Sequence, residues 1–458
     1  MKNNTIAAIA TAPGSSGISI IRISGDEAFL VADRVFRHVG GKKLSESPGF
    51  RAYFGKIYDK NEPIDEVIAL VMRGPKSYTG EDSVEISCHG GILVTRRILE
   101  CVLHAGASMA EPGEFTKRAF LNGRIDLSQA EAVIDLIDAK NEFAVKSSLS
   151  QLDGRLSDRI RAMRAQILDA MSYIEAALDD PEHISLEGYE EEFTPKIVGF
   201  IEEIQDLIKN YDDSKVLKSG IKTVILGKPN AGKSSLLNLF AGRDLAIVTD
   251  IAGTTRDVIS EQINISGIGF EIIDTAGIRQ TGDVVEKIGV SRSISAMEGA
   301  NLLLYVVDSS TELDENDRHI LSIMGDRKVI IVYNKTDLSS KVDETELRAL
   351  SPHATIIKMS AGDGTGFDKL KECMVSMFNS GSIAQNDQVI ITNLRHKEAL
   401  NSALTSLRRV LESIEGGFGE DLWNIDLQDA YESLGLIIGE AVGDDVVNNI
   451  FAKFCMGK

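Results

Sequence analysis

The chain has 458 residues, 43% of them hydrophobic and 26% charged, a globular composition long enough for about three domains. Its formal net charge of −20 argues against non-specific nucleic-acid binding, because neutralising backbone phosphates needs a basic face. That charge does not exclude a small basic pocket, or an RNA that a partner delivers.

The cysteines and the apolar runs favour a cytoplasmic protein. Cys88, Cys101, Cys373 and Cys455 show no C-x-x-C spacing and no disulfide framework, which favours a reducing compartment. The chain reaches Pro13-Gly14 too early for the apolar core of a signal peptide. No apolar run approaches the ~20 residues of a membrane span, so we expect no membrane insertion.

Residues 1–119 predict a small α+β domain, because short β-rich runs alternate with helical stretches. The β-rich runs are residues 18–23, 67–72 and 84–87, and one helical stretch covers 91–104. Arg22 lies inside one apolar run, where an unpaired charge would be costly, so it should have an anionic partner. Glu85 interrupts another run in the same way.

Amphipathic helices lie on both sides of a central segment, residues 220–379. Apolar residues recur at three- and four-residue steps across 125–208 and again across 400–441. Helices of this kind need a partner face. We therefore predict one discontinuous all-α domain, formed by residues 120–219 and 380–458, into which an α/β domain is inserted.

The inserted segment begins with a phosphate-binding loop. Gly227-Lys228-Pro229-Asn230-Ala231-Gly232-Lys233-Ser234 fits G-x-x-x-x-G-K-[ST] between an apolar strand and a helix that continues from Ser235. The glycines and the helix N-terminus direct several N–H groups at one anion. Lys233 is predicted to reach the β- and γ-phosphates, and the Ser234 hydroxyl to ligate Mg²⁺.

Two loops after later strands predict guanine as the base. Asn334-Lys335-Thr336-Asp337 follows the apolar run 329–333, and Asp337 can accept both N–H donors on the edge of guanine, which adenine lacks. Ser360-Ala361, after the strand 355–359, resembles the loop that gives a backbone N–H to the guanine oxygen. We therefore expect GTP to be bound.

Two switch segments complete the predicted site. In the first, Thr249-Asp250-Ile251-Ala252-Gly253-Thr254-Thr255, the last threonine would complete the Mg²⁺ shell. In the second, Asp274-Thr275-Ala276-Gly277, Asp274 would hold a Mg²⁺ water and the Gly277 N–H would sense the γ-phosphate. Each short motif alone could be an ordinary turn. Their order, each after a predicted strand, favours a Ras-like GTPase domain with a parallel sheet.

One departure from Ras-like proteins suggests potassium. Gly277 is followed by Ile278, where those proteins place a water-orienting glutamine. Asn230, together with the first switch, resembles the potassium-dependent GTPases, in which that asparagine and switch carbonyls hold K⁺ against the phosphates. That resemblance implies that Asn230, Thr249, Ile251 and Thr254 would hold K⁺, which would neutralise developing charge as an arginine finger does. The alternative for Asn230 is an ordinary turn-favouring residue.

Motifs outside the GTPase segment resemble the MnmE (TrmE) family over essentially the whole chain. They are Arg22-Ile23-Ser24-Gly25, Ser77-Tyr78-Thr79-Gly80-Glu81-Asp82, His89-Gly90-Gly91, Pro112-Gly113-Glu114-Phe115, Gln129-Ala130-Glu131-Ala132 and the tail 451–458. The tail ends Phe454-Cys455-Met456-Gly457-Lys458, close to the F-C-I-G-K of that family.

The resemblance implies a tRNA-modification GTPase with a flavoprotein partner, MnmG, which uses FAD and NADH. Together they would add an aminomethyl or carboxymethylaminomethyl group to carbon 5 of the wobble uridine in certain tRNAs. Residues 1–119 would be similar to the folate-binding domain of the glycine-cleavage T-protein. They would bind 5-formyl- or methylene-tetrahydrofolate as the one-carbon donor and form a homodimer.

The resemblance also implies roles for individual residues. Folate contacts fall on Arg22, Glu85, Arg124 and Lys458; the alternatives are a structural ion pair for the first two and a frayed terminus for Lys458. Cys455 would be functional in the family, although it could be a plain small hydrophobe. The residues expected to act in GTP hydrolysis are Asn230, Lys233 and Glu286. Glu286 would orient the attacking water; the alternative is a solvated acidic residue on a helix surface.

Two other functions fit the GTPase motifs alone. A ribosome-assembly GTPase of the Era or Der kind would carry a basic RNA-binding module or a second GTPase domain, and this sequence shows neither. A GTP-gated dimeric scaffold would not bind folate, so folate binding separates it from the predicted modification enzyme.

Overall fold

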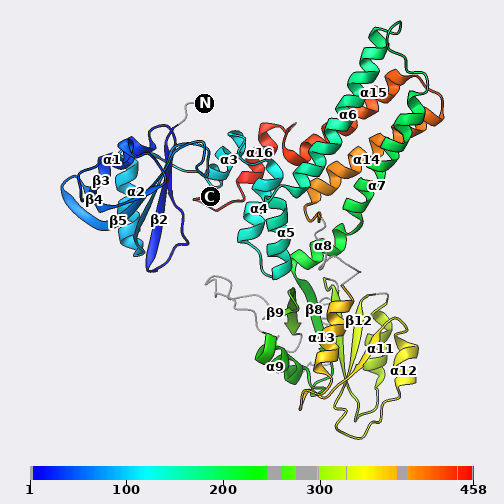
Figure 1. Cartoon of the computed structure of the whole chain (residues 1–458). Helices are drawn as coiled ribbons and strands as arrows, with labels where there is room; N and C mark the ends of the chain where they lie inside the picture. Colours follow the sequence, from blue (N-terminus) through cyan, green and yellow to red (C-terminus); the bar gives the residue numbers. More distant parts are fainter. Residues whose placement is uncertain are drawn as a thin grey trace. The chain divides into compact units, whose positions relative to one another are not determined.

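The computed structural model describes residues 4–244, 260–274, 297, 299–325, 327–378, 389–440, 442–455 and 457–458. The chain divides into two compact units, each built from segments that are distant in the sequence (Figure 1). The first comprises Met1–Ile134, Gln151–Glu190 and Thr405–Lys458, and the second comprises Asp135–Ser150 and Glu191–Leu404. The second unit therefore interrupts the first twice along the chain.

A seven-stranded sheet with two helices forms the N-terminal part of the first unit. Its strands are β1 (Ile6–Ile9), β2 (Ile18–Ser24), β3 (Phe36–His38), β4 (Arg51–Asp59), β5 (Glu62–Met72), β6 (Ser83–His89) and β7 (Ser108–Met109). They lie in the order β3-β4-β5-β6-β2-β1-β7, antiparallel except for the β1–β7 pair. The helices α1 (Ala28–Val35) and α2 (Ile92–His104) share one apolar core with the sheet. The expected α+β fold is confirmed.

The register of two central strands places a charged pair on the sheet. Along β2, Ile21 and Ile23 are buried in the core, so Arg22 between them points to the opposite face. In β6, Glu85 is likewise flanked by buried residues. The antiparallel register sets Arg22 directly opposite Glu85, the geometry in which cross-strand side chains interact.

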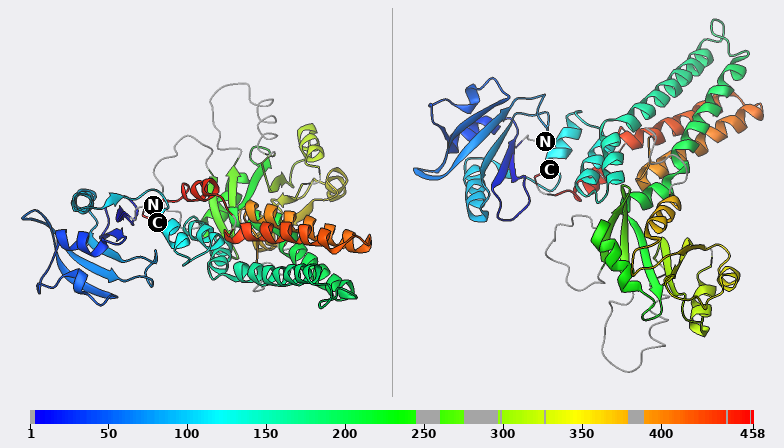
Figure 2. Two further views of the ribbon diagram at one scale, coloured as in Figure 1. Left: turned by 90° about the horizontal axis from the view of Figure 1, so that it is seen from above. Right: turned by 60° about the horizontal axis from the view of Figure 1, so that its bottom comes forward.

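Helices from both flanks of the nucleotide-binding segment pack together in the first unit. The helix α6 (Arg155–Asp179) precedes that segment and α15 (Glu420–Ile438) follows it, and the two lie side by side (Figure 2). Their buried positions are Ile160, Met163, Ile167 and Ile174 on α6 and Leu427, Ala430, Leu434 and Ile437 on α15. These positions recur at helical spacing, which confirms the discontinuous helical domain.

The other helices outside the two sheets are shorter or connect the units. They are α3 (Glu114–Leu121), α4 (Leu127–Ile137), α5 (Glu142–Leu152), α7 (Tyr189–Lys209), α8 (Tyr211–Ser219), α14 (Leu394–Glu415) and α16 (Asp444–Phe451). A small apolar cluster joins α3, α4 and α16, with Phe451 and Phe454 of the C-terminal segment inside it. This cluster holds the end of the chain within the first unit.

The second unit contains a six-stranded sheet of the parallel α/β type. Its strands are β8 (Ile221–Gly227), β9 (Ser260–Ile265), β10 (Ile268–Asp274), β11 (Leu302–Asp308), β12 (Val329–Asn334) and β13 (Thr355–Lys358). They lie in the order β13-β12-β11-β8-β10-β9, and only β9 is antiparallel to its neighbour. This confirms the Ras-like sheet expected from the sequence.

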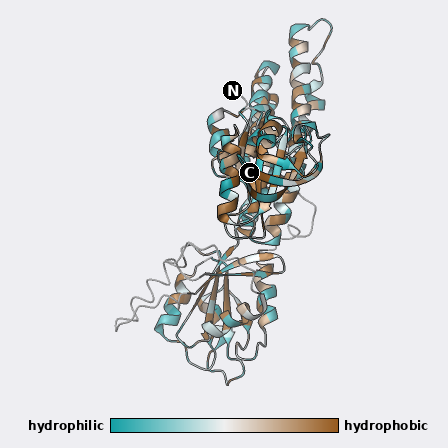
Figure 3. Cartoon of the chain, turned by 90° about the vertical axis from the view of Figure 1, so that its left-hand side faces the viewer, coloured by the Kyte–Doolittle hydropathy of each residue, from teal (hydrophilic) through white to brown (hydrophobic). Residues whose placement is uncertain are grey.

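Helices cover both faces of this sheet. On one face α9 (Lys233–Asp244) and α13 (Phe367–Ser376) contribute to one apolar core, and on the other α11 (Glu315–Ile323) and α12 (Glu344–Leu350) contribute to a second. Strands covered on both faces read as continuous apolar runs, as β11 and β12 do. In Figure 3 the strands of the sheet in the lower part of the view are mainly brown, the colour of hydrophobic residues. The carboxyl ends of the parallel strands meet at one edge, where open α/β sheets bind ligands.

Candidate functional site

The predicted phosphate-binding loop leaves β8 at Gly227 and enters α9 at Lys233. Three of its residues have positive φ: Gly227 at 140°, Asn230 at 64° and Gly232 at 104°. A Cβ on Gly227 would lie 2.4 Å from the carbonyl oxygen of Val306 in β11, so only glycine allows this approach. Ser234 and Ser235 are exposed in the first turn of α9, where a hydroxyl can reach a bound cation.

Lys233 folds back over the loop that it belongs to. Its Nζ donates to the carbonyl oxygens of Gly227 and Lys228, both at 2.6 Å, and the residue is buried. An anion that binds the loop would meet this cation together with the N–H groups at the start of α9.

Asn334 joins the phosphate-binding loop to both predicted guanine loops. Its Nδ2 donates to the Ala231 carbonyl at 2.7 Å, and its Oδ1 accepts from the Ala361 N–H at 2.8 Å. Asn334 is 1% exposed, and a Cβ on Gly232 would lie 2.1 Å from its Nδ2. The structure therefore brings together three segments that are far apart in the sequence.

The guanine loops are fixed further by their own contacts. Lys335 has φ 62° and its Nζ contacts Asp308 Oδ2 at 2.6 Å. Burial raises the pKa of Asp308, but hydrogen bonds led by that from Lys335 lower it more, so the pKa lies below its ordinary value. The Thr336 N–H donates to the Met359 carbonyl at 3.3 Å, beside buried Ser360. Asp337 is exposed, as a base-contacting carboxylate must be before ligand binds.

Several predicted nucleotide-site residues lie outside the described part of the chain. They are Thr249, Asp250, Ile251, Ala252, Gly253, Thr254, Thr255, Thr275, Ala276, Gly277 and Glu286, together with the side chain of Asp274. The backbone of Asp274 ends β10, where it pairs with Ile225 of β8. Asn230, the predicted potassium ligand within the described part, is exposed.

A second candidate site surrounds Arg22 and Glu85 in the first unit. Arg22 Nε donates to Glu85 Oε1 at 2.9 Å, and its Nη2 lies 2.8 Å from the same oxygen. Their side chains are 13% and 19% exposed. The third guanidinium nitrogen, Nη1, donates to the Gly457 carbonyl at 3.1 Å. Arg22 therefore has the anionic partner expected from the sequence, and it also binds the C-terminal segment.

Two aromatic rings and two more cations complete this cluster. The guanidinium carbon of Arg22 lies 5.2 Å from the centre of the Tyr78 ring and 5.5 Å from that of buried Phe115. Arg124 and Lys458 lie 5.1 Å and 5.9 Å from the Tyr78 ring. Such distances suit cation–π attraction. No ligand-binding role was predicted for Tyr78 or Phe115 from the sequence, although both lie in motifs that carry the family resemblance.

Lys458 lies in an unfavourable place for a cation. Burial, and then the charge of Arg22, lower its pKa below the ordinary value, while Glu85 opposes that change. Arg22, Arg124 and Lys458 thus lie around one aromatic ring, and Arg22 is paired with the Glu85 carboxylate. This group of cations would attract an anionic ligand.

Glycines let the C-terminal segment approach this cluster closely. Gly457 has φ 92°, and a Cβ there would lie 2.3 Å from the Ile9 carbonyl oxygen. The Gly113 N–H donates to the Cys455 carbonyl at 3.4 Å. Cys455 itself is exposed and therefore does not serve as a core hydrophobe. Met456, beside it, lies outside the described residues.

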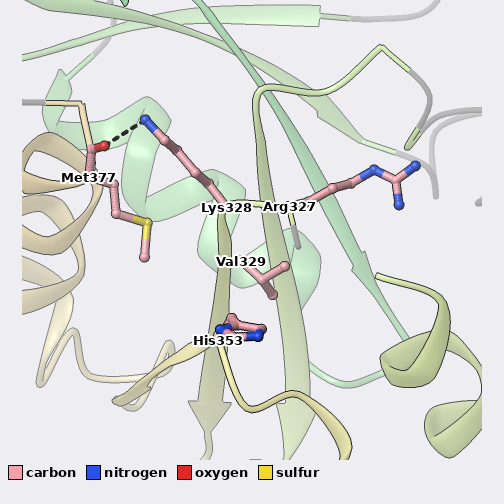
Figure 4. A pocket seen from close by; sticks show the side chains of 5 residues that line it. All are labelled: Arg327, Lys328, Val329, His353 and Met377. Atoms are coloured by element: carbon pink, nitrogen blue, oxygen red, sulfur yellow. Dashed lines mark hydrogen bonds between the residues drawn. The ribbon is translucent and has the colours of Figure 1, made fainter. Parts of the chain in front are cut away.

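A separate cavity of about 490 Å³ carries three basic side chains but does not form an anion site. Figure 4 shows Arg327, Lys328 and His353 pointing in different directions. Arg327 donates to two carbonyls at the end of α11, and Lys328 donates to the Met377 carbonyl at 2.8 Å. The cavity lies at the start of β12, at the opposite end of this strand from Asn334.

Among the described residues, no group of three or more histidine, cysteine, aspartate or glutamate side chains could hold a metal ion. No helix within the same part of the chain has the length and apolarity to cross a membrane.

Known proteins match the chain over its full length. The family model for the GTP-binding protein TrmE N-terminus matches residues 5–124, and that for the MnmE helical domain matches residues 127–455. A protein of Lachnoclostridium phytofermentans named tRNA modification GTPase MnmE is 53% identical over 459 residues, covering 100% of both chains. Proteins with the same name from Acetivibrio thermocellus and Enterococcus faecalis are 46% and 45% identical, over 100% of this chain and 100% and 99% of theirs. The chain therefore belongs to the MnmE family of tRNA modification GTPases.

Proposed function

We propose that this GTPase hydrolyses GTP in a potassium-dependent manner to support modification of the wobble uridine in certain tRNAs. It would act as a homodimer with an MnmG-type flavoprotein that carries FAD and uses NADH, in the cytoplasm where tRNA is processed. The observation that carries the GTP half is the contact of Asn334 with Ala231 and Ala361. That contact supports the proposal, because it joins the loop of residues 227–234 to the loops of residues 334–337 and 360–361.

We also propose that the chain forms three domains. Residues 1–119 would bind tetrahydrofolate and form the dimer, and residues 120–219 with 380–458 would form the helical domain. Residues 220–379 would form the GTPase domain. Because α6 and α15 pack across the sequence gap that this domain fills, its nucleotide-dependent movement could act on the helical domain from both of its connections.

Each residue of the GTP site would have a defined role. Lys233 would bind the β- and γ-phosphates, and Asp337 would read guanine. Ser234 fits Mg²⁺ because its hydroxyl is exposed at the start of α9, with Thr255 and, through water, Asp274 as further ligands. Mg²⁺, when bound, would neutralise phosphate charge. Glu286 would orient the attacking water.

Asn230 would hold K⁺ with oxygens of Thr249, Ile251 and Thr254. The described part of this site fits, because Asn230 is exposed and its left-handed backbone makes it the corner of the phosphate-binding loop. K⁺, when bound, would supply positive charge against the phosphates. The chain needs such a charge because no glutamine follows Gly277.

The potassium proposal is tested by GTP turnover in potassium and in sodium chloride at equal ionic strength. The wild type should turn over at least tenfold faster in potassium. Asn230→Ala should lose that preference, whereas Asn316→Ala, an exposed asparagine of α11, should keep it. Equal wild-type rates in both salts, or an unchanged preference in Asn230→Ala, would refute potassium dependence.

The cluster around Arg22 would bind a tetrahydrofolate. A folate combines a flat pterin, whose N–H edge matches the Glu85 carboxylate, with glutamate carboxylates that Arg124 and Lys458 can pair. Tyr78 and Phe115 supply aromatic surface beside Arg22. The three cations around the Tyr78 ring support an anionic ligand over a purely structural ion pair, because the Arg22–Glu85 pair alone would need neither Arg124 nor Lys458. Cys455 would be a functional thiol near this site.

Calorimetry with 5-formyl-tetrahydrofolate tests whether the cluster around Arg22 binds a tetrahydrofolate. Lys458→Ala and Glu85→Gln should each weaken binding at least tenfold, about 1.4 kcal/mol. Lys453→Ala, which removes an exposed lysine of the same C-terminal segment, should stay within twofold of the wild type. No binding by the wild type, or unchanged binding by both site variants, would leave only a GTP-gated scaffold.

A further inference from the structure

We propose that Lys228 is a positioning residue, which anchors the phosphate-binding loop to α11 and thereby fixes Asn230 in its left-handed conformation. This inference rests on the proposed potassium dependence, since it gives Asn230 a defined place for the ion. Lys228 does not act as a phosphate ligand in this arrangement. The carboxylates of Asp314 and Asp317 already hold its charge.

The anchor is an ion pair with the first turn of α11. Lys228 Nζ lies 2.8 Å from Asp314 Oδ2 and 2.5 Å from Asp317 Oδ2. Both separations are of hydrogen-bond length, so the ammonium group is held between the two carboxylates at the start of α11.

The carboxylates are themselves held rigidly. Asp314 and Asp317 form a capping box: the Asp317 N–H donates to Asp314 Oδ1 at 2.9 Å, and the Asp314 N–H donates to Asp317 Oδ2 at 3.1 Å. Tyr305 in β11 donates its hydroxyl to Asp317 Oδ1 at 2.6 Å and is fully buried. Asp317 is 5% exposed, so it has little freedom to follow a moving lysine.

The backbone of Lys228 begins the turn that presents Asn230. Its carbonyl accepts from the Ala231 N–H at 3.3 Å, which closes a four-residue turn with Pro229 and Asn230 at its corners. Proline at the second position and a residue of positive φ at the third fit a type II turn. The same carbonyl accepts from Lys233 Nζ at 2.6 Å. Lys228 is thus held both by its side-chain ammonium group and by its backbone carbonyl, and this fixes the start of the turn.

The ion pair of Lys228 would act by fixing the backbone of the turn, rather than by adding positive charge near the phosphates. Asparagine adopts the left-handed backbone conformation at a higher conformational free energy than glycine, so both ends of the turn need to be held in place. An uncharged side chain at position 228 would leave Asp317 buried with one partner fewer. We therefore expect loss of Lys228 to loosen the turn around Asn230 before it affects the guanine loops.

The test uses the full-length protein and four variants. Lys228→Met removes the anchor, Lys228→Arg keeps a cation, and Tyr305→Phe removes one support of Asp317. Arg318→Met is the matched control, because Arg318 also lies on α11 and forms an exposed ion pair, at 2.7 Å, with Glu346 of α12. Thermal melting establishes that each variant is folded before it is compared.

Three measurements follow: amide hydrogen exchange of residues 227–232, the potassium concentration at half-maximal GTP turnover, and the affinity for a fluorescent GDP. Lys228→Met should exchange at least fivefold faster and need at least fivefold more potassium, with GDP affinity within threefold of the wild type. Tyr305→Phe should change in the same direction, and Lys228→Arg and Arg318→Met should resemble the wild type.

Two outcomes would overturn the positioning role. One is unchanged exchange and potassium response in Lys228→Met. The other is a loss of GDP affinity larger than the change in potassium response, which would make Lys228 a phosphate ligand. A wild type that responds equally to sodium would instead refute the proposed potassium dependence, and the exchange measurement would still decide whether Lys228 anchors the turn.

Discussion

Substituting Gly457 by alanine should release the C-terminal segment from the candidate folate site. The residue has φ 92°, and the added Cβ would lie 2.3 Å from the Ile9 carbonyl oxygen and 2.8 Å from the Cα of Ala10. Both contacts are with backbone of the N-terminal sheet domain. No side-chain rotation can relieve them, so the C-terminal segment must move away.

The magnitude follows from what this movement removes. Left-handed backbone costs alanine about 1–2 kcal/mol relative to glycine, before any overlap is counted. Moving Gly457 also breaks its hydrogen bond with Arg22, of a charged kind that contributes roughly 1.5–3 kcal/mol. Even the smaller of these losses is worth roughly a factor of five to thirty in an equilibrium. Tetrahydrofolate affinity should therefore fall at least tenfold.

Calorimetry with 5-formyl-tetrahydrofolate and amide hydrogen exchange of the tail measure this effect. Gly443→Ala is the matched control, because a Cβ at that position meets nothing within 4 Å and its φ is −68°. The melting temperature should fall by only several degrees in Gly457→Ala and stay unchanged in Gly443→Ala, since Phe451 and Phe454 keep their places in the apolar cluster. Wild-type affinity in Gly457→Ala, with a protected tail, would refute the argument that the tail builds this site.

Three further substitutions test the GTPase unit. Gly232→Ala places a Cβ 2.1 Å from Asn334 Nδ2 and should weaken GTP binding at least tenfold by equilibrium titration; unchanged affinity would contradict the role of that contact. Phe143→Ala empties a position of the sheet core and should lower the free energy of unfolding in urea by about 3–5 kcal/mol; a loss under about 1 kcal/mol would contradict it. The pKa of Asp308 is lowered in the fold, so its pairing with Lys335 stabilises the protein above the unfolded pKa of about 3.9 and is lost as the pH falls through the folded value. The melting-temperature advantage of the wild type over Asp308→Asn should shrink from pH 6 to pH 3, and a constant difference would contradict this assignment.

The sheet of the second unit was predictable because its signals are local. An apolar run, a glycine-containing loop and a helix start follow one another at β8 and α9, and each step has a physical cause that the sequence shows directly. The discontinuous helical domain was predictable for another reason. Amphipathic faces on both flanks needed a partner, and α6 with α15 provides it.

The candidate sites were less accessible, because their decisive contacts depend on the fold. The sequence indicated that Arg22 needs an anion, but the register of β2 and β6 decides that Glu85 is the partner. Tyr78 and Phe115 come from a loop and a helix, and neither carries a charge whose burial would have drawn attention to it. The anchor of Lys228 on Asp317 joins positions 89 residues apart, so no local pattern shows it.

Both candidate sites depend on the same kind of contact, in which a buried or half-buried polar side chain donates to a backbone carbonyl of a distant segment. Asn334 donates to the Ala231 carbonyl and Arg22 to the Gly457 carbonyl. A carbonyl is present at every residue, so the identity of the acceptor cannot specify such a contact. Specificity must come from the residue that allows close approach, and a glycine with positive φ lies at or beside each acceptor. It follows that a Cβ at Gly232 or Gly457 should damage these sites as severely as loss of the donor, although neither glycine contributes a side chain to them.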